Sequence, residues 1–131
     1  MTSFDVVLDL SIEDAESAVR AALADHGFDV LTEINVSAAF KAKLGVDHAP
    51  LKILGACNPE FAYQAVLIDP AASLALPCNV VLEAVGGSTR VSVADPRDLM
   101  TDVELSELAE AVATRLQGVV ATLRKSSLRS P

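Results

Sequence analysis

The chain is poor in aromatic and basic side chains. It contains no Trp, one Tyr and four Phe among 131 residues, so stacking platforms for nucleic-acid bases are not expected. Only 10 Lys and Arg residues are set against 18 Asp and Glu residues, which gives a formal net charge of −8. Nucleic acids and anionic membrane surfaces are bound by clustered basic residues. We therefore expect no nucleic-acid partner and no membrane partner.

The sequence also lacks long apolar runs and the pattern of a secretory leader. Its uninterrupted apolar segments are far shorter than a membrane span, and residues 1–5 have neither a basic start nor an apolar core. The expected location is cytoplasmic. In that reducing compartment the two cysteines, Cys57 and Cys78, are not expected to form a structural disulfide.

Motifs of conventional enzymes and cofactor sites are missing as well. We find no Ser-His-Asp, phosphate-loop or dinucleotide-binding pattern, and Gly86-Gly87 is too short to be one. Two thiolates alone cannot complete a four-ligand zinc site. The sequence therefore assigns no enzyme class, no cofactor and no metal site.

What the chain does have is enough apolar sequence for one folded domain over residues 1–131, with 51% hydrophobic residues. Apolar periodicity predicts an alternating order of strands and helices, βαβαβαββα. This order favours an α+β fold with a single mixed, largely antiparallel sheet of about five strands and helices packed on one face. The predicted strands cover residues 4–10, 28–36, 51–56, 78–85 and 90–94, and the helices 12–26, 37–44, 59–68 and 101–124.

Several element boundaries have recognisable signals. Capping-box patterns at 11–14 and 101–104 predict two helix starts, and Gly86-Gly87 predicts a hairpin turn. Asp95-Pro96 should end the last strand, and residues 126–131 should form a frayed tail. Alternation in the second strand predicts that Phe28, Val30, Thr32, Ile34 and Val36 share one face, and that Asp29, Leu31, Glu33 and Asn35 share the other.

The stretch from Lys52 to Pro59 carries the most chemical information. Asn58 is a favoured N-cap residue and Pro59 suits the first helical position. Cys57 should therefore precede a helix N-terminus, a setting that lowers the pKa of a thiol. About twenty residues later, Cys78-Asn79 repeats the Cys-Asn pair at the start of another apolar strand.

These two pairs predict a shared site at neighbouring strand ends. Its candidate ligand-binding residues are Cys57, Asn58, Cys78 and Asn79, together with His48 from the preceding loop. The two cysteines are also the candidate catalytic residues. The alternative is structural: free cysteines are among the most buried residue types, and His48 can be an ordinary exposed loop residue.

Four segments resemble the domain-of-unknown-function 302 family, and together they span most of the chain. The resemblance implies a small bacterial or archaeal α+β domain that forms homodimers, and it implies no established activity. The matching segments are Gly27–Ile34, Lys43–Val46, Lys52–Pro59 and Leu76–Val80.

Three functions remain open at this point. The first is a homodimer that binds a small ligand near the Cys-Asn pairs, with a second copy covering the sheet face that carries no helices. The second is a sulfur-relay or redox protein that uses the thiols of Cys57 and Cys78. The third is a soft-metal site formed by both thiolates, with His48 as a further ligand.

Overall fold

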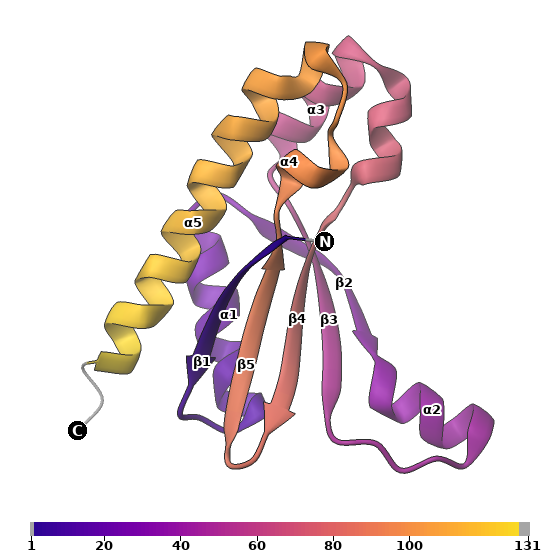
Figure 1. Cartoon of the computed structure of the whole chain (residues 1–131), viewed down its shortest axis with the longest axis vertical. Helices are drawn as coiled ribbons and strands as arrows, with labels where there is room; N and C mark the ends of the chain where they lie inside the picture. Colours follow the sequence, from indigo (N-terminus) through magenta and orange to yellow (C-terminus); the bar gives the residue numbers. More distant parts are fainter. Residues whose placement is uncertain (1, 129–131) are drawn as a thin grey trace.

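The computed structural model describes residues 2–128, which form the predicted α+β fold (Figure 1). Its five-stranded sheet has the order β1-β5-β4-β3-β2, and all four strand pairings are antiparallel. None of the helices in this part of the chain is long and apolar enough to cross a membrane. The elements are β1 (Ser3–Leu8), α1 (Ile12–Asp25), β2 (Asp29–Asn35), α2 (Val36–Leu44), β3 (Leu51–Cys57), α3 (Pro59–Ile68), η1 (Pro70–Ala75), β4 (Cys78–Val85), β5 (Ser88–Ala94), α4 (Pro96–Leu99), η2 (Val103–Leu105) and α5 (Ser106–Leu128).

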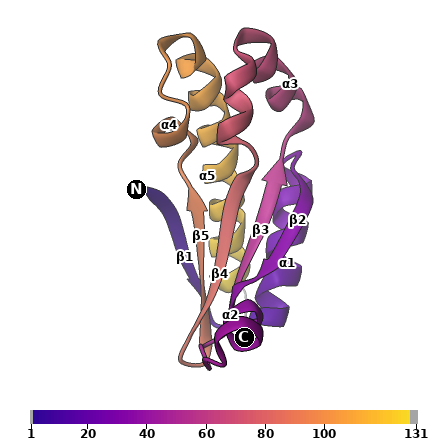
Figure 2. The ribbon, with the colours of Figure 1, turned by 90° about the vertical axis from the view of Figure 1, so that its right-hand side faces the viewer.

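Period-two alternation in the central strands builds the core. Val80 and Leu82 of β4 and Val91 and Val93 of β5 are fully buried, whereas the residues between them are at least partly accessible. Helices α1 and α5 cover this buried face (Figures 1 and 2). The predicted arrangement, with helices on one face of the sheet, is therefore confirmed.

Local capping signals set several boundaries as predicted. Ser11 caps α1 by accepting from the Asp14 amide at 3.2 Å, and Asn58 caps α3 by accepting from the Phe61 amide at 3.1 Å. Gly27 and Gly45 follow helix ends with φ of 84° and 67°, the left-handed conformation that glycine adopts without a Cβ penalty.

The predicted start of the last helix was wrong. Asp95-Pro96 ends β5 but also begins the short helix α4, because the Asp95 carboxylate accepts from the Arg97 amide at 3.0 Å. The chain then turns through η2, and α5 begins only at Ser106, so Thr101 caps no long helix. At its other end α5 continues to Leu128, so residues 126–128 are helical; the rest of the predicted tail, 129–131, lies outside the described residues.

The predicted alternation of the second strand was also wrong, because β2 contains a bulge between Val30 and Thr32. The extra residue at Leu31 shifts the register by one. Val30 still pairs with Ala56 on the helix-covered face, but Thr32 pairs with Gly55 and Ile34 with Ile53 on the opposite face. The apolar residues of β2 are thus divided between the two faces.

Candidate functional site at the cysteine end of the sheet

The two cysteines lie on neighbouring strands at the same end of the sheet. β3 ends at Cys57, the antiparallel β4 begins at Cys78, and Cys78 is directly opposite Ala56 in the ladder. Both cysteines are free thiols; Cys57 is half-buried and Cys78 is 5% exposed. The sequence prediction of neighbouring strand ends is confirmed.

A very small cavity separates the cysteines from α3. It holds about 10 Å³, close to the least volume that can contain one water molecule. Asn58 also lines it, with its side chain engaged in capping α3. The space between the cysteines and α3 is therefore closely packed and cannot hold an organic ligand.

The environment of the thiols does not favour thiolates. Burial raises the pKa of Cys57, and the negative charge of Asp29 raises it further. Burial also raises the pKa of Cys78 to about 11, with a smaller contribution from Cys57. The expected lowering of the Cys57 pKa was therefore wrong, because partial burial and the nearby Asp29 carboxylate both raise it.

The other two candidate residues lie away from the cysteines. Asn79 is exposed and pairs with Gly55, so it projects from the face opposite Cys78. His48 belongs to the exposed loop before β3, at the opposite end of that strand from Cys57, where its ring contacts the edge of Phe40 with centroids 5.5 Å apart. Within residues 2–128, no group of three or more His, Cys, Asp or Glu side chains is placed to hold a metal ion.

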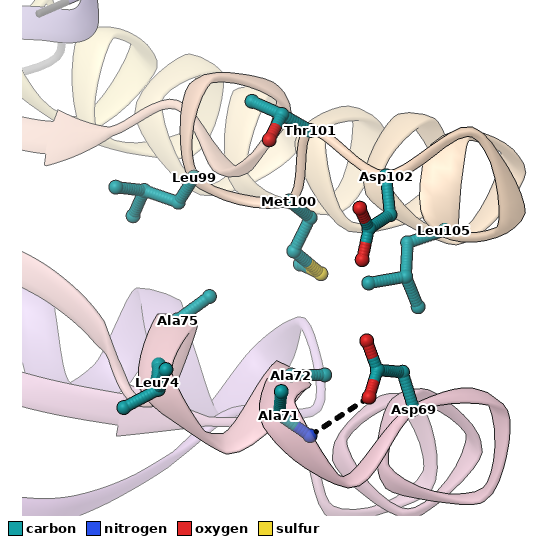
Figure 3. Close-up of a pocket in the computed structure, with 10 residues that line it drawn as sticks. All are labelled: Asp69, Ala71, Ala72, Leu74, Ala75, Leu99, Met100, Thr101, Asp102 and Leu105. Carbon is teal, nitrogen blue, oxygen red and sulfur yellow. Dashed lines mark hydrogen bonds between the residues drawn. The ribbon is translucent and has the colours of Figure 1, made fainter.

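A larger cavity lies next to the cysteine cavity and shares Met100 with it. Its volume is about 280 Å³, and it lies between η1 on one side and the segment from α4 to η2 on the other (Figure 3). The buried side chains of Ala72, Met100 and Leu105 line it, and the sulfur of Met100 points into the space.

Two carboxylates flank this cavity from opposite walls. Asp69 follows α3, and one of its oxygens accepts from the Ala71 amide at 3.0 Å. Asp102 precedes η2 and makes no capping hydrogen bond with it. Figure 3 shows the two side chains directed toward each other across the opening.

Sequence reasoning did not identify this cavity. Asp69 directly follows the predicted helix 59–68 and Asp102 lies in the predicted capping box 101–104, and an acidic residue is ordinary at either position. The sequence shows only that each acidic residue adjoins a short apolar connecting segment. This pattern is common at helix ends, so it does not indicate a cavity.

The fold places the chain among small α+β domains with a single antiparallel sheet. The chain belongs to the family described as Domain of unknown function DUF302, whose model matches residues 4–123. It is also similar to the crystal structure of an uncharacterized conserved DUF302 protein from Bacillus stearothermophilus. The two share 26% sequence identity with a TM-score of 0.86, over 95% of this chain and 99% of the other. No curated protein matches the chain.

Proposed function

We propose that this domain binds a small molecule in the cavity between η1 and the α4–η2 segment. The observation that carries the proposal is the cavity itself, whose volume of about 280 Å³ is close to the lower end of small-molecule sites, about 300 Å³. Its walls combine apolar side chains with a few polar groups, the usual composition of such sites. Through Met100 the ligand would lie beside the cysteine end of the sheet.

The cysteines serve in this proposal as part of the packed wall behind the ligand. Sulfur relay or redox chemistry has less support, because thiol nucleophiles react as thiolates and burial raises the pKa values of both cysteines. A soft-metal site has less support because His48 is at the other end of β3. Two sulfur ligands alone fill only half of a tetrahedral site.

The cavity can be tested by filling it. Ala71 lines the opening from an exposed position, so Ala71→Phe should block the cavity without disturbing the core. A fragment library of neutral, anionic and cationic compounds, screened by amide chemical shifts, should perturb Ala72, Met100 and Leu105 in the wild type. We expect those shifts to vanish in Ala71→Phe and to persist in Ala111→Phe, a matched change at an exposed position of α5.

A screen in which no fragment shifts the cavity residues of the wild type would remove the proposal. Binding that is equal in the wild type and in Ala71→Phe would place the ligand elsewhere.

The domain is further proposed to act as a homodimer joined through the sheet face opposite α1 and α5. Val7 and Ile34 on this face are 54% and 52% exposed, and Ile53 and Val81 form a cross-strand pair between them. Five strands of about seven residues give a footprint of roughly 500 Å² per copy. That area suits a weak to moderate interface, so dimerisation is expected at micromolar concentrations.

Charge on this face is arranged in a self-complementary way. Arg90 and Glu83 are cross-strand partners with an N–O distance of 2.8 Å, and both are partly exposed. A two-fold axis places the same surface of a second copy in reverse orientation. Each Arg90 can then approach the partner's Glu83. Although each chain has a net charge of −8, the Arg90–Glu83 pair is neutral, so the two copies do not repel each other at this point of the interface.

Charge exchange tests this interface. Glu83→Arg and Arg90→Glu each leave like charges on the face, so each variant alone should self-associate at least tenfold more weakly than the wild type. An equimolar mixture of the two variants should recover dimers in sedimentation velocity. The matched variants Lys41→Asp and Asp47→Lys alter another surface pair and should not change association. A wild-type mass of 13.7 kDa at micromolar concentration would contradict the dimer.

A further inference from the structure

We infer that the ligand of the η1/α4–η2 cavity is a small organic cation, an aliphatic compound carrying one or two primary ammonium groups. This inference rests on the proposed small-molecule function of the same cavity and adds the chemical class of the ligand. It follows from the charge, the apolar lining and the lack of aromatic side chains in the cavity.

The charge of the cavity is negative and not neutralised by neighbouring basic side chains. Asp69 and Asp102 face each other across the opening (Figure 3). Within residues 2–128, neither carboxylate takes part in an ion pair. The carboxylates that do so are those of Glu16, Glu33, Asp47, Glu83, Asp95 and Glu110.

A cation that lies between two carboxylates bordering one opening is attracted by both. The field of the whole chain acts in the same direction, because its net charge of −8 attracts cations and repels anions. An anionic metabolite is therefore a poor candidate for this cavity.

The apolar lining distinguishes an organic cation from a metal ion. Met100 is 6% exposed, Leu105 3% and Ala72 5%, and these side chains offer no hard oxygen ligand. A bare Mg²⁺ or Ca²⁺ ion requires six or more oxygen ligands from protein or water. A short alkyl chain, in contrast, gains free energy by leaving water for this lining.

The lining also distinguishes among organic cations. Quaternary ammonium groups are recognised by aromatic cages, and the described residues around this cavity include no aromatic ring. A primary ammonium group has three hydrogen-bond donors. The carboxylates of Asp69 and Asp102 present oxygen acceptors for it at the opening.

The experiment compares four four-carbon probes on the full chain: 1,4-diaminobutane, n-butylamine, 1-butanol and butyrate. Titrations followed by amide shifts of Ala71, Met100 and Leu105 give the affinities. We expect the diamine to bind most tightly, the monoamine at least fivefold more weakly, and butanol and butyrate at least fiftyfold more weakly than the diamine.

Charge-neutral variants identify the groups that hold the cation. Asp102→Asn should weaken diamine binding at least fivefold. The substitution removes no helix cap, because the Asp102 side chain makes no capping hydrogen bond. Asp69→Asn keeps an acceptor for the Ala71 amide and should weaken binding to a similar extent. Asp25→Asn, which makes the same charge change at an exposed position of α1, should change affinity less than twofold.

The outcomes separate this inference from the function on which it rests. Neutral or anionic fragments that bind in the cavity while both amines fail would overturn the cation inference and leave the small-molecule function intact. If Asp25→Asn and Asp102→Asn lose affinity equally, binding depends on the net charge of the chain and not on the carboxylates at the cavity. That result would also overturn the cation inference. A cavity that binds no compound of any class would end both.

Discussion

Gly55→Ala is expected to be among the most destabilising single changes in this chain, at about 3 kcal/mol. Gly55 is buried within β3, where the side chains of Thr32 and Pro77 cover it. A Cβ there would overlap the hydroxyl of Thr32 and lie 2.8 Å from Cγ of Pro77. To admit the methyl group, the Thr32 side chain would have to change its rotamer and the rigid Pro77 ring would have to shift. Urea unfolding of the variant should show the loss.

Two further variants show whether the close approach is the cause. Gly87→Ala places a Cβ where no atom lies within 4 Å, so it should change the free energy of unfolding by no more than about 0.5 kcal/mol. The double variant Gly55→Ala, Thr32→Ala removes the overlapping hydroxyl and should recover part of the lost stability. Equal effects of Gly55→Ala and Gly87→Ala would show that the packing of Thr32 and Pro77 on Gly55 does not constrain the fold.

The packing on Gly55 also explains what sequence periodicity could and could not predict. Strand alternation and helix caps depend on residues close in sequence, so the five strands, the four longer helices, their order and the cap at Asn58 were predictable. The bulge in β2 depends on the pairing of β2 with β3, in which Thr32 lies beside Gly55. Such a register shift is a tertiary effect, and the local pattern from Phe28 to Val36 does not contain it.

For the candidate site, the sequence predicted the position of the cysteines but neither their pKa values nor the larger cavity. The repeated Cys-Asn pair correctly indicated that Cys57 and Cys78 lie at neighbouring strand ends. The pKa of Cys57 depends on burial and on Asp29, a residue from another strand, and the pKa of Cys78 depends on burial and on Cys57. The larger cavity depends on how η1 packs opposite α4 and η2. The local sequence around Asp69 and Asp102 does not indicate that these two segments lie opposite each other.

Arg97 links the position of α4, and therefore one wall of the cavity, to the rest of the fold. Its guanidinium donates to both oxygens of the Asp95 carboxylate, with Nη2 to Oδ2 at 2.8 Å and Nε to Oδ1 at 3.0 Å. It also lies over the Phe4 ring of β1, 5.8 Å from the centroid. Asp95 is only 3% exposed, so removing its charged partner leaves a buried carboxylate with the Arg97 amide as its remaining capping donor.

Arg97→Gln should therefore lower the free energy of unfolding at pH 7, because it leaves the buried Asp95 carboxylate without its charged partner. The loosened α4 should also weaken ligand binding at the Met100 wall. The matched control is Lys41→Gln, which breaks an ion pair whose side chains are 62% and 88% exposed and should cost less than about 0.5 kcal/mol. Urea unfolding at pH 7 measures both differences, and equal losses in the two variants would contradict the structural role of Arg97.

The same variant should change how stability depends on pH. The hydrogen bonds from Arg97 lower the pKa of Asp95 below the ordinary value of 3.8. A carboxyl group with a lowered folded pKa contributes stability that is fully present above its unfolded pKa and is lost as the pH falls through its folded pKa. The wild type should therefore lose this contribution below about pH 4. Arg97→Gln has less of it to lose, so the free energies of unfolding of the two proteins should converge between pH 5 and pH 2. A constant difference across that range would show that Arg97 stabilises the fold through packing on Phe4 and not through the charge of Asp95.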